Sequence, residues 1–313
     1  MAPAFVHRDP KTVCVMDASC RLGASLVEAL LRRGYTVHAT AYASSHGKLN
    51  DLRRLQSGEN KQQLRCFRAD PFDYQSLVDA MKGCWGLFYV FEPPHDQPYD
   101  ECMAEVEVRA AHNVLEACAQ TETMERVVFT SSVTAVVWKE HRRSTATVDE
   151  RDWSDPNFCR RVKLWHALGK TLAEKTAWAL AMDRGVEMIS VNAAPPTGPQ
   201  LSVTNPYLKG AAEMYEDGVL VTVDEQLLVD AHVAVYESPS AYGRYICFGD
   251  AVCRPQDAVN LARMLSPNSS CAPPPSGELR VIEQRIQNKK LSKLMVSFYA
   301  GRHVEENDPS MQR

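Results

Sequence analysis

The pattern that most constrains the fold is a strand, a tight turn, a helix and a second strand within residues 12–40. Residues 12–16 form a short β-branched and apolar run, as expected of a strand buried on both faces. Apolar residues then recur at helical spacing through residues 22–30, and Gly34 stands where a helix would end. Residues 35–40 alternate like a second strand. This order of elements is typical of the first half of a dinucleotide-binding fold.

The turn between the first strand and the helix departs from the usual phosphate-binding fingerprint. That fingerprint would place glycine at positions 17, 20 and 23, but only Gly23 is present, and Asp17 and Cys20 occupy the other two. Glycine lets the backbone approach a pyrophosphate, whereas a carboxylate repels it. The sequence therefore predicts a nucleotide-binding architecture whose phosphate site has been altered.

Composition indicates an ordinary globular chain. The 313 residues are 45% hydrophobic and 24% charged, with a net charge of −4 and a pI of about 6.2. This balance gives no electrostatic support for a nucleic-acid or membrane partner. No apolar run of the kind that a secretory signal contains follows Met1, so we expect a cytoplasmic protein.

The cysteines indicate free thiols rather than a metal site or disulfides. Ten are present, none forms a CxxC pair, and several stand inside apolar runs. We therefore predict no bound metal.

Strand and helix signals continue to alternate after residue 40. Further strands are expected at 64–69, 86–91, 126–132 and 186–191, and helices at 74–82, 100–119 and 162–183. Single crossovers between strands favour a doubly wound, mainly parallel α/β sheet of seven strands. We expect a Rossmann-type domain over 1–198, to which the chain later returns, and a smaller substrate-side lobe with the C-terminal tail over 199–313.

Polar residues at one strand end and on one helix face are candidates for catalysis. Ser131 and Ser132 end a predicted parallel strand, where open α/β sheets bind ligands. His166 and Lys170 are four residues apart on a predicted helix and therefore share a face. A serine, a proton donor and a lysine over a dinucleotide crevice would suit carbonyl reduction, although a His–Lys pair at this spacing is more often a solvated helix face.

Longer motifs make a family resemblance specific. They are RRGYTVHAT, RADPFDYQSL, RVVFTSS, VDERDWSDPNFC, KTLAEKTAW, DAHVAVYESPSAYGRYIC and QNKKLSKL, and they are spread over nearly the whole chain. The chain resembles the extended short-chain dehydrogenase/reductases, in the plant branch of cinnamoyl-CoA reductases and dihydroflavonol reductases. It looks most similar to a cinnamoyl-CoA reductase-like protein. The resemblance implies NADP(H) as cofactor and a small acyl-CoA or related carbonyl substrate.

The resemblance also assigns catalytic positions. In the family, a serine and a tyrosine bind the carbonyl oxygen, the tyrosine gives the proton, and a lysine holds the nicotinamide ribose and lowers the tyrosine pKa. By position, the serine is Ser132 and the lysine is Lys170, but the tyrosine position is His166. The family signature KNWYCYGK reads KLWHALGK over residues 163–170.

Of the positions that the resemblance assigns to the cofactor, some match the family and others depart from it. The assigned positions are Asp17, Cys20, Arg21, Leu22, Tyr42, Lys48, Asp70, Lys170 and Ala193. Lys48 and Asp70 match the family, whereas Tyr42 replaces the arginine that contacts the 2′-phosphate of NADP. Phe91 and Glu92 replace a small Ala-Ser pair, and Gln226 and Leu227 replace an Arg-Asp pair.

These departures cluster on the cofactor side of an otherwise retained scaffold, and two interpretations follow. The chain is an NADP(H)-dependent reductase of hydroxycinnamoyl-CoA type substrates with impaired activity. Alternatively, it is a catalytically degenerate member that acts as a binding or regulatory protein, for example in plant defence or lignin-related metabolism. A purely structural role has no positive support.

Overall fold

The computed structural model describes residues 12–41, 62–92, 98–140, 147–198, 201–266 and 281–306. The main strands are β1 (Thr12–Met16), β2 (Thr36–Ala41), β3 (Leu64–Arg68), β4 (Gly86–Tyr89), β5 (Arg126–Ser132), β6 (Glu187–Ala193) and β8 (Gly243–Cys247). They form one seven-stranded sheet in the order β3-β2-β1-β4-β5-β6-β8. The pairs β1–β2, β1–β4, β2–β3, β4–β5 and β6–β8 are all parallel. The prediction of a doubly wound, parallel α/β sheet is confirmed.

The helices follow the strands as the sequence predicted. The longer ones are α1 (Arg21–Arg32), α3 (Tyr74–Met81), α4 (Glu101–Ala119), α7 (Trp165–Arg184), α9 (Glu225–Glu237), α10 (Pro255–Leu265) and α11 (Lys289–Glu306). Shorter elements are α5 (Thr134–Val137), α6 (Pro156–Arg161), the 3-10 helix η2 (Pro206–Leu208), α8 (Ala211–Glu216) and the strands β7 (Val221–Thr222) and β9 (Asp250–Ala251).

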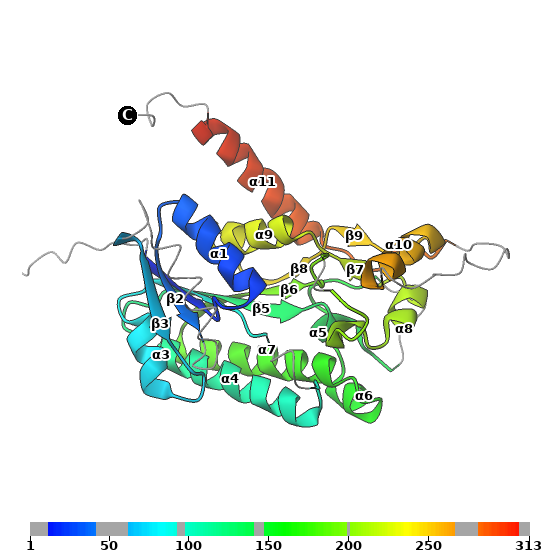
Figure 1. Cartoon of the computed structure of the whole chain (residues 1–313), viewed down its shortest axis with the longest axis horizontal. Helices are drawn as coiled ribbons and strands as arrows, with labels where there is room; N and C mark the ends of the chain where they lie inside the picture. The colour runs from blue at the N-terminus through cyan, green and yellow to red at the C-terminus, as the bar shows by residue number, and fades with distance from the viewer. Residues whose placement is uncertain are drawn as a thin grey trace, which may run out of the picture. The chain divides into compact units, whose positions relative to one another are not determined.

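The chain divides into two compact units that interleave along the sequence. The first unit comprises residues 1–92, 110–129 and 177–188, and the second comprises 93–109, 130–176 and 189–313. Within the first unit, α1 and α3 lie on opposite faces of the strands (Figure 1). Within the second unit, α11 packs on α9 and β8, and β8 pairs with β6. The C-terminal region thus returns to the sheet, and the expected division at residues 198 and 199 stays a prediction.

The helix expected over 162–183 begins three residues later than predicted, since α7 starts at Trp165. The short helix α6, which the sequence analysis did not predict, precedes it and ends at Arg161. Asp155 caps α6 by accepting hydrogen bonds from the next residues, and Lys163 then takes a left-handed backbone conformation with φ 58°. The Leu164 N–H donates to the Cys159 carbonyl, which is the wrap that closes a helix C-terminus. Local capping therefore overrides helical periodicity at this point.

The cysteines that the structure describes are free, as expected. Nine are present as thiols, and Cys271 lies outside the described residues. Burial raises the pKa of both Cys84 and Cys247 to about 12. Thiols with such pKa values are inert packing groups at neutral pH.

A buried carboxylate connects several elements of the second unit. Glu174 of α7 is fully buried and accepts hydrogen bonds from Ser131 Oγ at 2.7 Å and Ser190 Oγ at 2.6 Å. The Arg244 guanidinium of β8 pairs with the same carboxylate at 2.8 Å. One side chain therefore ties α7 to β5, β6 and β8.

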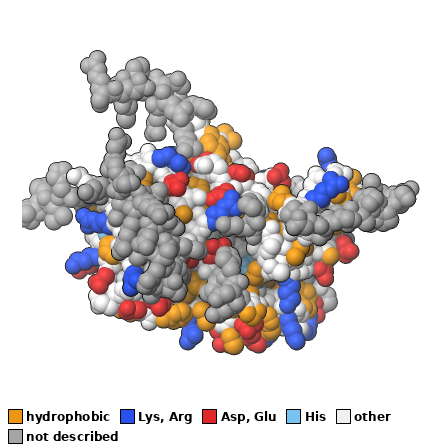
Figure 2. Space-filling view, in the orientation of Figure 1, with side chains coloured by type: hydrophobic (Ala, Val, Ile, Leu, Met, Phe, Trp, Pro, Cys, Tyr) orange, Lys and Arg blue, Asp and Glu red, His pale blue; other side chains and the backbone are white. Residues whose placement is uncertain are grey.

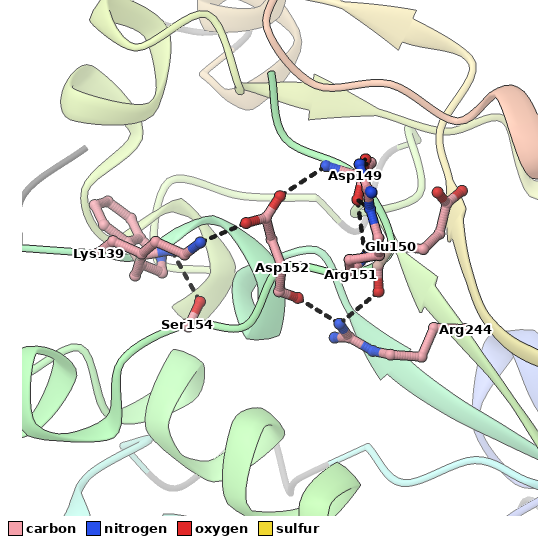
Figure 3. A network of polar contacts seen from close by, with 8 residues as sticks. Lys139, Asp149, Glu150, Arg151, Asp152, Ser154 and Arg244 are labelled. Carbon is pink, nitrogen blue, oxygen red and sulfur yellow. Dashed lines mark hydrogen bonds and ion pairs between the residues drawn. The ribbon is translucent and has the colours of Figure 1, made fainter. Parts of the chain in front are cut away.

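Arg244 also shapes the segment 149–153, which belongs to the motif VDERDWSDPNFC. Its Nη1 donates to the carbonyl oxygens of Glu150, at 3.0 Å, and Asp152 (Figure 3). The Trp153 ring lies 3.7 Å from the guanidinium carbon, a cation–π contact. The Asp152 carboxylate accepts from Lys139 and from the Asp149 N–H. Residues 149–153 of the motif therefore fold around the Arg244 side chain.

The visible surface shows no large field of one charge. On the face in Figure 2, acidic and basic side chains are interspersed. Among the described helices, none is long and apolar enough to cross a membrane.

The first prediction concerns Arg244. Replacing it with alanine leaves the Glu174 carboxylate buried without its cation, so we expect a loss of about 3–5 kcal/mol in the free energy of unfolding. Denaturant unfolding followed by circular dichroism measures this loss. The exposed Arg263→Ala in α10 is the matched control and should change stability by less than about 0.5 kcal/mol. Equal effects of the two substitutions would contradict the prediction.

Candidate functional site

The turn between β1 and α1 has a left-handed residue in it, although two of the glycines that the fingerprint would place there are absent. Asp17 has φ 58°, in the left-handed region that glycine adopts freely and aspartate tolerates. Its side chain is buried, and Oδ1 accepts a hydrogen bond from Ser19 Oγ at 2.6 Å. The Asp17 N–H donates to Thr40 Oγ1 at 3.0 Å. The aspartate thus preserves the turn while adding a carboxylate to it.

Cys20 acts as the N-cap of α1. Its Sγ accepts the Gly23 N–H at 3.3 Å, so one of the free donors at this helix end is already used. Gly23 packs tightly, because a Cβ there would lie 2.8 Å from the Ala18 Cα and would overlap the Asp17 carbonyl oxygen. Arg21 and Leu22 open the helix, where backbone N–H groups and the helix dipole favour an anion.

The other predicted cofactor residues lie apart in the sequence. Asp70 follows β3, and its carboxylate accepts the Phe72 N–H at 2.9 Å, which closes a local turn. Ala193 ends β6, and its carbonyl accepts the Val133 N–H at 3.0 Å. Tyr42 and Lys48 lie outside the described residues.

The second unit brings Ser132 and His166 into one hydrogen-bonded chain. Ser132 is buried at the end of β5, and its Oγ accepts from the Thr134 N–H at 3.1 Å and from Thr134 Oγ1 at 3.0 Å. Thr134 Oγ1 lies 3.1 Å from His166 Nδ1. Because the threonine proton goes to Ser132, His166 Nδ1 must be the donor. Sequence reasoning missed Thr134, which stands only two residues beyond the strand end.

His166 is neutral in this environment. Burial and, to a smaller extent, the charge of Lys170 lower its pKa to about 3. The sequence predicted the effect of Lys170, and its direction is confirmed, but burial is the larger cause. The rings of Tyr99 and Tyr207 supply part of this enclosure, with centroids 5.3 and 6.3 Å from the imidazole.

Lys170 is paired with a carboxylate that the sequence analysis did not select. Its Nζ lies 2.7 Å from Glu107 Oε1, and both side chains are buried. Glu107 Oε2 also accepts a hydrogen bond from the Tyr99 hydroxyl. A signal for Glu107 was present, since it interrupts the buried apolar face of α4 formed by Ala104 and Ala111.

The three catalytic candidates therefore belong to the second unit, together with Ala193, Thr134, Glu107 and Tyr99. Asp17, Cys20, Arg21, Leu22 and Asp70 belong to the first. Within the described residues, no group of three or more His, Cys, Asp or Glu side chains could hold a metal ion.

Comparison with known proteins defines the class. Residues 14–188 match the model of the 3-beta hydroxysteroid dehydrogenase/isomerase family. The chain belongs to this family, within the extended short-chain dehydrogenase/reductases, and its resemblance to that superfamily is confirmed.

Plant cinnamoyl-CoA reductases are among the proteins that this chain is similar to. The chain is 40% identical over 263 residues to cinnamoyl-CoA reductase 2 of Arabidopsis thaliana, covering 82% of this chain and 78% of that protein. It is 36% identical over 298 residues to cinnamoyl-CoA reductase 1 of Petunia hybrida, covering 92% and 88%. Among solved structures, vestitone reductase from alfalfa matches with a TM-score of 0.67 and 25% identity, over 90% and 91% of the two chains. The yeast methylglyoxal/isovaleraldehyde reductase Gre2 complexed with NADPH shares the fold, with a TM-score of 0.68 and 20% identity over 91% and 93%.

The lowered pKa of His166 predicts acid sensitivity. The unfolded chain binds a proton on this histidine below its ordinary pKa of 6.5, but the folded chain does so only near pH 3. His232, whose pKa burial lowers to about 4, acts in the same direction. The free energy of unfolding should therefore be greatest above pH 6.5 and fall as the pH is lowered towards 3.

Urea unfolding at pH 7.5, 6.0 and 5.0 measures this slope. His166→Gln should make the fall with acid shallower, and the same change at the exposed His112 should leave it unchanged. An identical slope in wild type and His166→Gln would show that His166 titrates normally.

Proposed function

We propose that the protein is an NADP(H)-dependent reductase of hydroxycinnamoyl-CoA type thioesters whose turnover is low. The observation that carries this proposal is the cluster of Ser132, His166 and Lys170 in one unit of a chain 40% identical to a cinnamoyl-CoA reductase. Ser132 and Lys170 stand at the positions that the resemblance assigns to the family's serine and lysine. The position that it assigns to the tyrosine holds His166, whose pKa burial lowers to about 3.

The first unit offers a partial fit to the cofactor. The α1 turn has the left-handed residue, the tight glycine contact and the helix N-terminus that a pyrophosphate requires. Arg21 and Leu22 would hold the phosphates by their backbone N–H groups. The Asp17 carboxylate opposes phosphate binding by charge repulsion. Cys20 opposes it because its Sγ already accepts the Gly23 N–H. When bound, the reduced nicotinamide would supply a hydride.

Ser132 is poised to orient a carbonyl group. Its oxygen already accepts two hydrogen bonds from Thr134, so its own proton is left to point towards a substrate oxygen. Such a donor fixes the carbonyl and stabilises negative charge that develops on its oxygen.

His166 is a poor acid in this arrangement. Its Nδ1–H is committed to Thr134, and a pKa of about 3 leaves Nε2 unprotonated at neutral pH. General acids contribute about 10²–10⁴-fold to rate. We therefore expect turnover below that of a member with a tyrosine at this position by a factor of this order.

The second candidate function is a binding or regulatory protein without turnover, for example in plant defence or lignin-related metabolism. The buried Asp17 carboxylate in the phosphate turn favours it. Under either function we expect a small-molecule ligand and a cytoplasmic protein. Calorimetric titration of the purified protein with NADPH, followed by turnover of feruloyl-CoA, separates the two. If the protein neither binds NADPH nor reduces feruloyl-CoA, that result favours the second function.

A prediction on cofactor affinity follows from Asp17. Its carboxylate should cost a nearby phosphate a few kcal/mol at an effective dielectric of about 20, which is about 100-fold in Kd. Asp17→Gly removes the charge, and glycine accepts the left-handed backbone, so NADPH should bind about 100-fold more tightly. The double variant with Cys20→Gly should bind at least as well. Low-micromolar binding by the wild type that neither change improves would contradict the prediction.

A further prediction concerns the tyrosine position. His166→Tyr restores a phenol one helical turn from Lys170 and should raise the rate of feruloyl-CoA reduction. The gain should be clearest in an Asp17→Gly background, where more cofactor binds. Steady-state rates with NADPH measure it. Robust wild-type turnover that His166→Ala abolishes would show instead that the histidine is a working acid.

A further inference from the structure

The phenol of Tyr99 lies against the turn of α7 that carries His166. Tyr99 precedes α4 in the sequence, yet its ring meets the His166 imidazole edge-on, at 5.3 Å and an interplanar angle of 76°. Any reduction of a carbonyl needs a proton at the carbonyl oxygen, and His166 is neutral with its Nδ1–H engaged. Tyr99 brings an ionisable hydroxyl to this place from a different element.

Gly169 makes room for that hydroxyl. A Cβ on Gly169 would overlap the Tyr99 hydroxyl and would lie 3.1 Å from the Ala104 Cα. A larger residue at this position would therefore push Tyr99 away from α7. The glycine immediately before Lys170 is what lets the phenol lie against the backbone of α7.

Glu107 joins the phenol to the lysine. One carboxylate oxygen accepts the Tyr99 hydroxyl and the other lies 2.7 Å from Lys170 Nζ. Glu107 is 2% exposed and Lys170 8% exposed, so this pair is held in a dry environment. Tyr99 itself is half-buried, so the chain of contacts runs from a buried cation through a buried carboxylate to the hydroxyl of a half-buried ring.

We propose that Tyr99 is the proton donor of this site, in place of a residue at position 166. This assignment rests on the proposed reductase function. As the carbonyl carbon of the thioester accepts a hydride from the reduced nicotinamide, the electron pair of the C=O bond moves to oxygen. The Tyr99 hydroxyl, which donates to Glu107 Oε2 in the resting site, turns to this oxygen and gives it its proton, and the phenolate regains a proton from water. The resulting hemithioacetal releases the aldehyde and the thiol of CoA.

Glu107 is then a positioning residue that also weakens the donor. It holds the Tyr99 hydroxyl beside α7, and its negative charge offsets that of Lys170. A free cation beside a phenol favours loss of the phenol proton, whereas a neutral ion pair does so less. Slow turnover is the expected consequence of this charge balance.

Tyr99→Phe tests the assignment, because it removes only the hydroxyl. With feruloyl-CoA and NADPH we expect kcat to fall by about 10²-fold or more, with the Kd for NADPH unchanged within about threefold. Tyr215→Phe, in which another half-buried phenol loses its hydroxyl, is the control and should keep wild-type kcat. Wild-type kcat in Tyr99→Phe overturns the assignment and leaves the reductase function standing.

Glu107→Gln supplies a readout that a merely structural tyrosine would not move. Glutamine still accepts the phenol hydrogen bond but leaves the Lys170 charge unbalanced, so the pH profile of kcat should shift towards lower pH. Glu105→Gln, an exposed change two residues earlier in α4, should leave the profile in place. An unshifted profile in Glu107→Gln overturns the proposed role of Glu107.

The link itself can be measured without turnover. A double-mutant cycle on the free energy of unfolding, built from Tyr99→Phe and Glu107→Gln, should show that the two changes are coupled. Additive effects overturn the hydrogen-bonded link. Wild-type protein that binds NADPH but never reduces feruloyl-CoA overturns both the reductase function and the catalytic role of Tyr99.

Discussion

The second unit depends on one fully buried carboxylate. Glu174 accepts hydrogen bonds from two strands and pairs with Arg244, which in turn organises residues 149–153. A buried charge is costly unless its partners surround it, so arrangements of these elements that separate Glu174 from its partners are disfavoured. The arrangement that keeps these partners together sets where β5 ends and where α7 lies, and thus the places of Ser132 and His166. The polar core of this unit is therefore the frame of the candidate site.

Much of the fold could be predicted from local sequence signals. The β-branched run at Thr12–Met16, the capping residue Asp73 and the alternation of strand and helix gave the correct order of elements. These signals act over a few residues, so a single sequence contains them in full. The start of α7 was predicted three residues too early, because the left-handed turn at Lys163 and the wrap of Leu164 onto Cys159 depend on contacts of α6 that helical periodicity does not contain.

The candidate site could be predicted only in part. Ser132 and Lys170 follow from strand ends and helix spacing, and from the family resemblance. Tyr99 and Glu107 were missed because Glu107, which pairs with Lys170, and Tyr99, which bonds Glu107, belong to a segment far earlier in the sequence. Contacts of that kind depend on how elements pack, which no local pattern records. The pKa of His166 was likewise predicted in direction but with the wrong dominant cause, since burial is a property of the folded chain.

The left-handed backbone at Asp17 limits which residues this position can hold. Glycine, asparagine and aspartate adopt that conformation readily, whereas β-branched and bulky residues do not. Among these three, asparagine differs from aspartate by exchange of a single oxygen for an NH₂ group. Asparagine at this position would therefore remove the carboxylate charge from the turn while keeping a residue that tolerates its backbone conformation. Geometry and electrostatics at this position are separately adjustable, so a lineage could alter ligand preference here while inheriting the same backbone.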